Sequence, residues 1–312
     1  MKDRKYLFGP VPSRRFGRSL GVDLMPYKTC TLDCVFCQLG RTTNQTIERS
    51  NYMNMDEVLT ELEEWIDTDG EADYITLSGS GEPTLHEGFG EVLALIRRKT
   101  NIPSLLLTNG TLLHLPEVRM AAAQASVVKV SLCAWDRESY GWVNRPHGEL
   151  RFDDLISGQK AFRQEYAGQL WMEVFLVPGM NALPEDVRRI AALAEEIRPE
   201  RIQLNTAVRP AAEDFAVPLS RERMTELTHL FHPEAEVIAE FSKSKDRKVQ
   251  ANRDSVLAML RRRPCTAEQI ADGFGMHLHE VSKYLGSLLS AKEIRSERKG
   301  GTVYYAAVGR AT

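Results

Sequence analysis

The chain has 312 residues, of which 43% are hydrophobic, and a net charge of −3. This length exceeds one minimal domain, so we expect one large or two unequal domains built around a substantial core. The near balance of charges argues against a generic nucleic-acid coat protein. The charge is uneven, because residues 251–312 carry 10 Lys and Arg against 6 Asp and Glu, which puts +4 there and −7 on the remainder.

The cysteines and the N-terminus indicate a compartment. Five cysteines, three of them in one motif, fit a reducing cytoplasm better than a disulfide framework. The stretch from Met1 to Lys5 is charged, and no run of about 18 apolar residues occurs. We therefore expect a soluble cytoplasmic protein without a membrane-spanning segment.

The first stretch of the chain, residues 6–19, is rich in Gly, Pro and Arg. This composition predicts a loop that ends in a short strand near residues 20–24. Its arginines, Arg14, Arg15 and Arg18, have two interpretations: a solvated basic loop, or contacts to an anionic group of a ligand.

Three cysteines follow at Cys30, Cys34 and Cys37, separated by three residues and then by two, with an aromatic residue before the last. Three close thiolates on an irregular segment can bind three irons of a [4Fe-4S] cluster, which ordinarily has four protein ligands. The fourth iron would stay open and could bind a reacting ligand. The alternatives are cysteines scattered in a core and a structural zinc site, for which His86 and His114 are the nearest downstream histidines.

Strand and helix patterns alternate after this motif, which indicates βαβ units, a parallel sheet and the α/β fold class. A further short strand is expected at residues 236–239. The six main strands are expected near residues 20–24, 74–78, 104–108, 127–132, 170–177 and 201–206. The helices are expected near residues 54–66, 88–99, 116–124, 153–166, 184–197 and 221–231.

Four of these strands carry polar residues on one face, as period-two alternation assigns them. Parallel-barrel enzymes place their chemistry near the carboxyl ends of the strands, so this face is the candidate lumen. The alternative for each residue is a satisfied hydrogen bond in the core. The residues assigned to this face are Thr76, Ser78, Ser80, Lys129, Ser131, Cys133, Glu173, Phe175, Gln203 and Asn205.

The cysteine motif resembles that of the radical S-adenosylmethionine (SAM) superfamily, Cys-x3-Cys-x2-Cys with an aromatic before the third cysteine. It matches at Cys30, Cys34, Phe36 and Cys37. The resemblance implies a partial (β/α)6 TIM-like barrel and a [4Fe-4S] cluster whose open iron chelates SAM. It also implies reductive cleavage of SAM to methionine and a 5′-deoxyadenosyl radical, with a reductase such as flavodoxin or ferredoxin as the electron donor.

Other stretches resemble SAM-binding motifs of the superfamily. Gly81, Glu82 and Pro83 follow the second strand, where relatives have a Gly-Gly-Glu type turn that binds the SAM amino group. A small-residue turn lets backbone carbonyls approach a ligand, and Glu82 would accept from the ammonium. The other cofactor-binding candidates are Phe36 beside the adenine, Asn109, Ser131, Glu173 and Asn205.

Residues 9–15, 37–42 and 144–146 resemble a prokaryotic branch of the superfamily related to the wyosine-base tRNA enzymes, over about the first 240 residues. Two departures limit this resemblance. Wyosine synthases bind a second cluster through upstream cysteines, whereas this chain has none before Cys30. Cys133 stands where we expect Asp in relatives, and it is either an inert buried thiol or a catalytic hydrogen-atom donor.

The pattern after residue 251 predicts three helices and a hairpin with a Gly-Gly turn, an order that resembles a winged helix-turn-helix. We therefore expect a barrel domain at 1–241 with an N-terminal loop extension, a linker at 242–250 and a winged helix-turn-helix domain at 251–312. Its exposed face would bind nucleic acid, a peptide or the barrel itself. The candidate residues are His279, Ser282, Lys283, Ser287, Arg295, Arg298 and Lys299.

The leading hypothesis is a radical SAM enzyme that abstracts hydrogen from a macromolecular substrate, with tRNA favoured. The first alternative keeps this chemistry but applies it to a peptide or a small metabolite. The second is an iron–sulfur regulator that binds DNA through the winged helix. A turn that resembles a SAM-binding motif disfavours the regulator, because a sensor needs no ligand cradle.

Overall fold

Two expectations from the sequence, the linker at residues 242–250 and the pair Arg14 and Arg15, lie outside the residues that the computed structural model describes. Within the described residues, no helix has the length and apolar character needed to cross a membrane. The described residues are 4–13, 17–68, 70–239, 253–262, 264–274 and 276–308.

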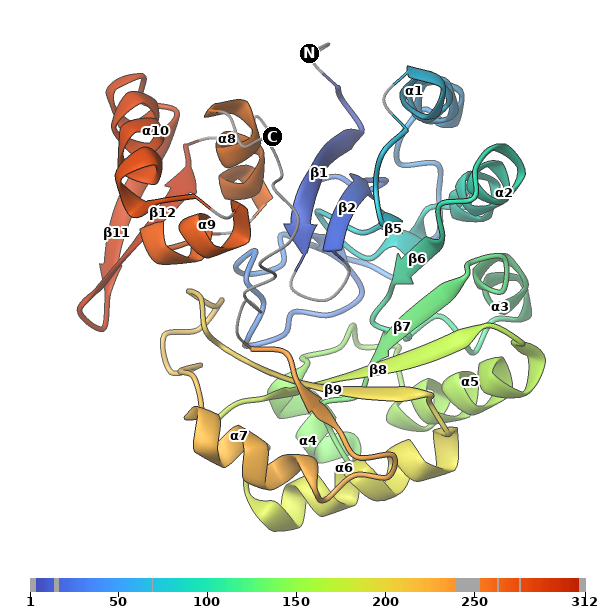
Figure 1. Ribbon diagram of the computed structural model, residues 1–312. Helices are drawn as coiled ribbons and strands as arrows, with labels where there is room; N and C mark the ends of the chain where they lie inside the picture. The colour runs from blue at the N-terminus through green and yellow to red at the C-terminus, as the bar shows by residue number, and fades with distance from the viewer. Residues whose placement is uncertain are drawn as a thin grey trace.

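The central element is an eight-stranded sheet with the order β1-β2-β5-β6-β7-β8-β9-β10 (Figure 1). Neighbouring strands from β2 to β10 are parallel, whereas β1 is antiparallel to β2. The sheet is curved and open, with β1 and β10 at its ends, so the expected α/β fold with a partial TIM-like barrel is confirmed. The strands are β1 (Leu7–Ser13), β2 (Gly17–Val22), β5 (Tyr74–Leu77), β6 (Ser104–Leu107), β7 (Val127–Ser131), β8 (Gln169–Leu176), β9 (Arg201–Thr206) and β10 (Glu236–Val237).

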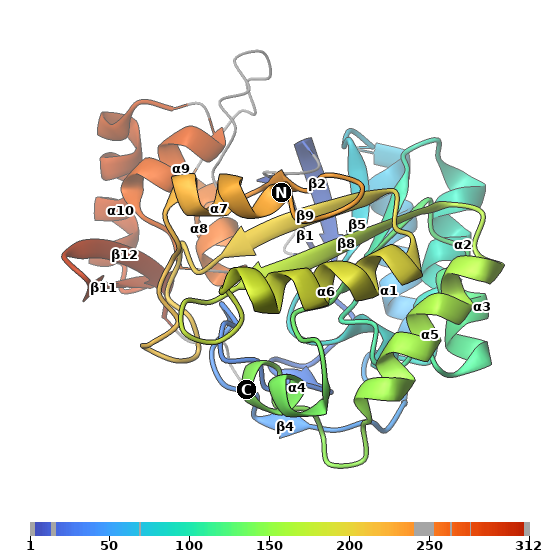
Figure 2. The same cartoon turned by 90° about the horizontal axis from the view of Figure 1, so that it is seen from below.

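Helices cover the outer side of this sheet (Figures 1 and 2). The strands turn apolar side chains toward them, as the alternation predicts, so that Leu77, Val128 and Leu204 are fully buried in the main core. Trp65 and Phe89 enter the same core from the helical layer. The helices are α1 (Met55–Thr68), α2 (Phe89–Lys99), α3 (Pro116–Ala122), α5 (Phe152–Glu165), α6 (Pro184–Ile197) and α7 (Arg221–Thr228).

The N-terminal segment differs from the expected loop extension. Residues Leu7–Ser13 form β1, whose register against β2 shifts between Phe8 and Val11. Gly9 and Pro10 lie at this irregularity. Because β1 is an end strand of the sheet, a proline without an N–H is tolerated there. The Gly- and Pro-rich composition therefore belongs to a bulged edge strand rather than to a loop.

Four short elements have no counterpart among the expected ones. The longest, α4, begins after Asp136, whose carboxylate accepts from the Ser139 N–H at 2.8 Å in a capping box. The four elements are α4 (Arg137–Val143), the 3-10 helix η1 (Pro83–Leu85), β3 (Thr29–Cys30) and β4 (Asn44–Gln45).

The C-terminal residues build a core of their own, separate from that of the barrel, with Val256, Ile270, Val281, Leu285 and Leu288 at its centre. Both α8 and α9 contact β1, and the unit lies beside the open edge of the sheet (Figure 1). Three helices and a hairpin follow the expected order; the name winged helix stays a prediction. The elements are α8 (Arg253–Arg262), α9 (Ala267–Phe274), α10 (Leu278–Ser290), β11 (Ile294–Lys299) and β12 (Thr302–Ala307).

Candidate active site

The three cysteines of the motif lie on one loop at the end of the barrel. Cys30 closes β3, and the Cys37 N–H donates to the Cys34 carbonyl at 3.1 Å in the turn that follows. The neighbours of this loop come from the carboxyl ends of the parallel strands, since Asn109 follows β6 and Phe175 lies near the end of β8. This is the end where parallel-barrel enzymes place their chemistry.

Each cysteine sulfur accepts a hydrogen bond from a different side chain. The Asn109 amide donates to Cys30 Sγ at 3.6 Å, and the Asn144 amide, just after α4, donates to Cys34 Sγ at 3.3 Å. The side chain of Lys28 donates to Cys37 Sγ through Nζ at 3.2 Å. Such outer contacts orient metal-binding ligands and tune the metal that they bind.

The three motif cysteines are half-buried, and their charges influence one another. Burial raises the pKa of Cys30 to about 12, and burial with the neighbouring Cys30 and Cys37 raises that of Cys34. The hydroxyl of Tyr140 is also buried beside Cys34 and has no hydrogen-bond partner in the described part of the chain. Three soft sulfur ligands next to an unsatisfied polar atom fit an iron–sulfur group, whose binding would displace the thiol protons.

The ring nitrogens of the two histidines named for the zinc alternative bind backbone groups away from the cysteines. His86 Nδ1 accepts from the Gly88 N–H at 3.0 Å, and His114 Nδ1 donates to the Thr111 carbonyl at 2.8 Å. Among the described residues, no three His, Cys, Asp or Glu side chains are grouped to hold one metal ion. A cube does not require such a group, because each thiolate binds a different iron.

Glu82 occupies the turn after β5 and is buried. Its Oε1 accepts from the backbone N–H and the hydroxyl of Thr84 and from the hydroxyl of Thr108, and its Oε2 accepts from the Asn109 N–H at 2.8 Å. Three of these donors share Oε1, and one binds Oε2. Burial raises the pKa of Glu82, and these bonds oppose that shift. Glu82 therefore joins the turn after β5 to the turn after β6.

The small residues of this turn permit close approach to the cysteine loop. A Cβ on Gly81 would stand 1.8 Å from the Thr29 carbonyl oxygen, which excludes a side chain there. The next residue, Glu82, donates its N–H to the same carbonyl at 3.1 Å, and Pro83 begins η1. The sequence prediction that this turn and the cysteines share one site is therefore consistent with the contact between them.

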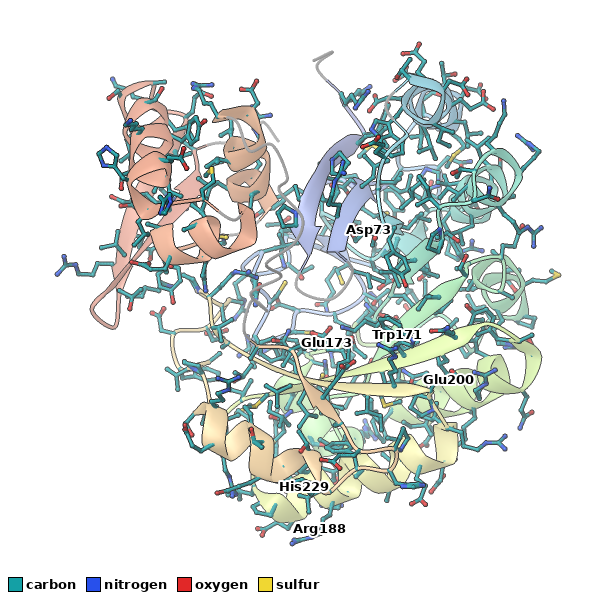
Figure 3. All side chains as sticks on the ribbon, in the orientation of Figure 1. Asp73, Trp171, Glu173, Arg188, Glu200 and His229 are labelled. Carbon is teal, nitrogen blue, oxygen red and sulfur yellow. The ribbon has the colours of Figure 1, made fainter. Side chains whose placement is uncertain are left out.

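The lumen contains the expected polar side chains in layers. Lys129 and Glu173 form an ion pair across β7 and β8, and the Asn205 amide donates to Glu173 Oε1 at 2.7 Å. Below them Trp171 packs with Val127 and apolar neighbours; Figure 3 labels Trp171 and Glu173, which lie on the same strand. Along the barrel axis, the ion pair thus lies between the apolar cluster around Trp171 and the cysteine loop.

The remaining candidates, Phe36, Cys133 and Ser131, lie near the carboxyl ends of β7 and β8. The Phe36 ring stacks on Phe175 with centroids 4.2 Å apart. Cys133 belongs to the same small apolar cluster, and its Sγ accepts from the Phe175 N–H at 3.3 Å. Burial raises the pKa of Cys133 to about 12, so the thiol keeps its proton at neutral pH. Ser131 pairs with Glu173 in the β7–β8 ladder, and its carbonyl accepts from Gln159 at 3.1 Å.

The connection between β9 and α7, residues 207–220, covers part of the cysteine loop. The Glu213 N–H donates to the Val35 carbonyl at 3.1 Å, and its carboxylate pairs with Arg145 and Arg41. Arg145 is the main cause of the lowered pKa of Glu213, with Arg41 adding to it. This connection also meets the C-terminal unit, because Gln269 and Tyr304 donate to the Val208 carbonyl.

Sequence reasoning missed several of these residues. Lys28 and Glu213 carry no pattern that singles them out. Asn144 belongs to residues 144–146, which resemble relatives, but the sequence does not indicate that its amide contacts Cys34. Conversely, Arg18 lies at the start of β2 and pairs with Glu71 at 3.6 Å, so the structure places it away from the cysteine loop.

Comparison with known proteins identifies the family. A sequence model described as the radical SAM superfamily matches residues 24–203. The chain belongs to the radical SAM superfamily. It is accordingly an enzyme that uses a [4Fe-4S] cluster and SAM.

Relatives extend over most of the chain. It is 33% identical over 316 residues to a "UPF0026 protein" of Helicobacter pylori, covering 96% of this chain and 97% of that one. It is 34% identical over 306 residues to a "GTPase Obg" of Brachyspira hyodysenteriae, covering 97% of this chain but only 45% of the relative, so it spans less than half of that protein. The solved structure of "TYW1 with a lysine-pyruvate adduct bound" has the same fold, with a TM-score of 0.52 and 15% identity over 73% of this chain and 76% of that chain.

Proposed function

We propose that Cys30, Cys34 and Cys37 hold the [4Fe-4S] cluster and that the enzyme abstracts hydrogen from a macromolecular substrate, with tRNA favoured. The observation that carries this proposal is the placement of three thiols at the carboxyl end of the barrel, each held by its own donor. When bound, the cluster supplies the electron that cleaves SAM. The protein supplies orientation and exclusion of water.

The proposed SAM site combines the turn at Gly81, Glu82 and Pro83 with lumen residues. Glu82 Oε2 accepts from one protein donor, so it and the backbone carbonyls of the turn are the candidate acceptors for the SAM ammonium. Phe36, stacked on Phe175, remains the candidate for the adenine. The candidates for the ribose and amino acid are Asn109, Ser131, Glu173 and Asn205.

The role of Cys133 is proposed as a hydrogen-atom donor. Transfer of its thiol hydrogen to a substrate radical would form a C–H bond and leave a thiyl radical, which one electron and one proton from the reductant and solvent would restore. We expect Cys133→Ala to keep SAM cleavage but to change or abolish product, as product analysis by mass spectrometry would detect. A Cys265→Ala control should form normal product. Unchanged product from Cys133→Ala with the native substrate would contradict this role.

The C-terminal unit is the proposed substrate-positioning element. Its exposed side chains include His279, Lys283, Arg295 and Arg298. Lys299 instead forms an ion pair with Asp214 of the β9–α7 connection at 3.1 Å. A basic exposed face next to a segment that covers the cysteine loop supports a nucleic-acid substrate. Ser282 and Ser287 complete the exposed face of α10.

We expect Arg298→Glu to weaken tRNA binding severalfold and to lower the slope of affinity against salt by about one, because one phosphate contact is lost. Filter binding over a salt series measures both. Arg188→Glu, on α6 of the barrel, should leave both unchanged (Figure 3). Equal binding by the two variants would favour a peptide substrate or a docking role.

The substrate assignment is tested by turnover. Reconstituted enzyme, dithionite and SAM would be incubated anaerobically with separate tRNA and peptide pools, and modified nucleosides or residues would be sought by mass spectrometry. A modified nucleoside supports tRNA; a modified peptide overturns it. We further propose flavodoxin or ferredoxin as the reductant and a reducing cytoplasm as the compartment, where free thiols persist.

A further inference from the structure

We propose that Lys28 raises the reduction potential of the cluster, acting as a positively charged partner of Cys37; this inference rests on the proposed cluster site. Lys28 is 2% exposed, and its Nζ lies 3.2 Å from Cys37 Sγ. A buried ammonium requires a partner of suitable charge. A cysteine thiolate supplies one.

Hydrogen bonds on both sides of Lys28 hold its backbone in place. It has a φ of 60°, in the left-handed region that non-glycine residues rarely adopt. Its N–H donates to the Ser80 carbonyl at 2.7 Å, and its carbonyl accepts from the N–H groups of Thr43 and Asn44 at 3.2 and 3.1 Å. The strained conformation is therefore held from both sides, as strain at functional sites commonly is.

Lys28 differs in kind from the other donors. In the described part of the chain, the side-chain hydrogen bonds to the three motif sulfurs come from two neutral amides, of Asn109 and Asn144, and from one ammonium. The influence of Lys28 extends beyond Cys37, because its charge lowers the pKa of Cys30 whereas the charge of Glu82 raises it. Lys28 thus offsets a buried negative charge beside the cysteines.

The direction of the effect follows from charge. One electron enters from an external reductant and no atom moves, so the reduced site carries one more negative charge than the oxidised site. A nearby ammonium stabilises the reduced form more, and the low dielectric of a buried place strengthens that difference. Charge and hydrogen bonds at the sulfurs are known determinants of iron–sulfur potentials. With a higher potential, the cluster could be reduced by a weaker external reductant.

The test is an anaerobic redox titration, monitored by electron paramagnetic resonance, of the reconstituted full-length protein without SAM. We expect Lys28→Met to lower the equilibrium constant for reduction at least tenfold, which is about 59 mV for one electron. Lys28→Arg keeps the charge and should stay within a few-fold of wild type. Lys160→Met is the control: this half-exposed lysine pairs with Glu196, and the equilibrium constant for reduction of this variant should equal that of wild type.

Each outcome decides the inference separately from the proposed function. A wild-type protein that binds no cluster contradicts the proposed site, and the inference fails with it. A cluster present in both proteins, with equilibrium constants for reduction less than twofold apart, overturns the inference alone. Weaker SAM binding by Lys28→Met without a potential shift would assign Lys28 to the SAM carboxylate instead.

If Lys28→Met assembles no cluster, Lys28→Gln is titrated against wild type, with the same expected direction. Failure of both variants, with normal assembly of Lys28→Arg, would make Lys28 a residue for cluster retention and overturn its role in setting the potential.

Discussion

Cys34→Ser is expected to lose its cluster and to reduce SAM cleavage to background. Cys34 is the middle proposed ligand of the motif, its Sγ accepts from the Asn144 amide, and burial raises the pKa of its thiol. Loss of an outer-shell partner typically costs roughly 10–100-fold in metal affinity, and loss of a direct ligand should cost more. Iron and sulfide analysis with visible absorption measures the effect after anaerobic reconstitution.

The matched control for this variant is Cys265→Ala. Cys265 is fully buried in the separate C-terminal core, so its removal perturbs packing but no proposed ligand. It should retain wild-type iron content per folded protein. Full iron and sulfide content in Cys34→Ser would exclude Cys34 as a ligand.

The second large effect concerns the ion pair in the lumen. Glu173→Leu should lower the free energy of unfolding by about 3–5 kcal/mol, because the buried Lys129 ammonium would lose its carboxylate. Asn205 would lose an acceptor as well. Urea denaturation followed by circular dichroism measures the change.

A double variant separates this charge effect from packing. Lys129→Met combined with Glu173→Leu should recover most of the lost stability, since replacement of a whole buried pair by apolar side chains is often neutral. Glu196→Leu, which breaks the exposed pair with Lys160, should cost about 1 kcal/mol or less. A Glu173→Leu variant as stable as Glu196→Leu would contradict the account of the lumen.

The parallel sheet could be predicted from the sequence because strand and helix patterns alternate along the chain. The faces of its strands could be predicted because period-two alternation is a local property. Leu77 and Val128 face the helices while Lys129 and Glu173 face the lumen, as their spacing indicates. The N-terminal strand could not be predicted, because Gly and Pro punctuate it, and only its position at the sheet edge makes Pro10 acceptable.

The candidate site could be predicted in part. The cysteine spacing and the turn at Glu82 are contiguous motifs, so they are visible in the chain. The acceptor bonds of Glu82 come from two separate turns, and the amide of Asn144 reaches Cys34 across 110 residues, so both depend on tertiary structure. Lys28 is next to the motif, but its direction depends on a left-handed backbone that the sequence does not signal.

The most direct test of the central claim is anaerobic SAM cleavage. Reconstituted wild-type protein would receive dithionite and SAM, and 5′-deoxyadenosine would be quantified by mass spectrometry beside Cys34→Ala, with tRNA and peptide pools added in parallel. We expect 5′-deoxyadenosine from wild type and none above background from the variant. Equal amounts from both proteins, or none from a wild-type protein with an intact cluster under every condition, would contradict it.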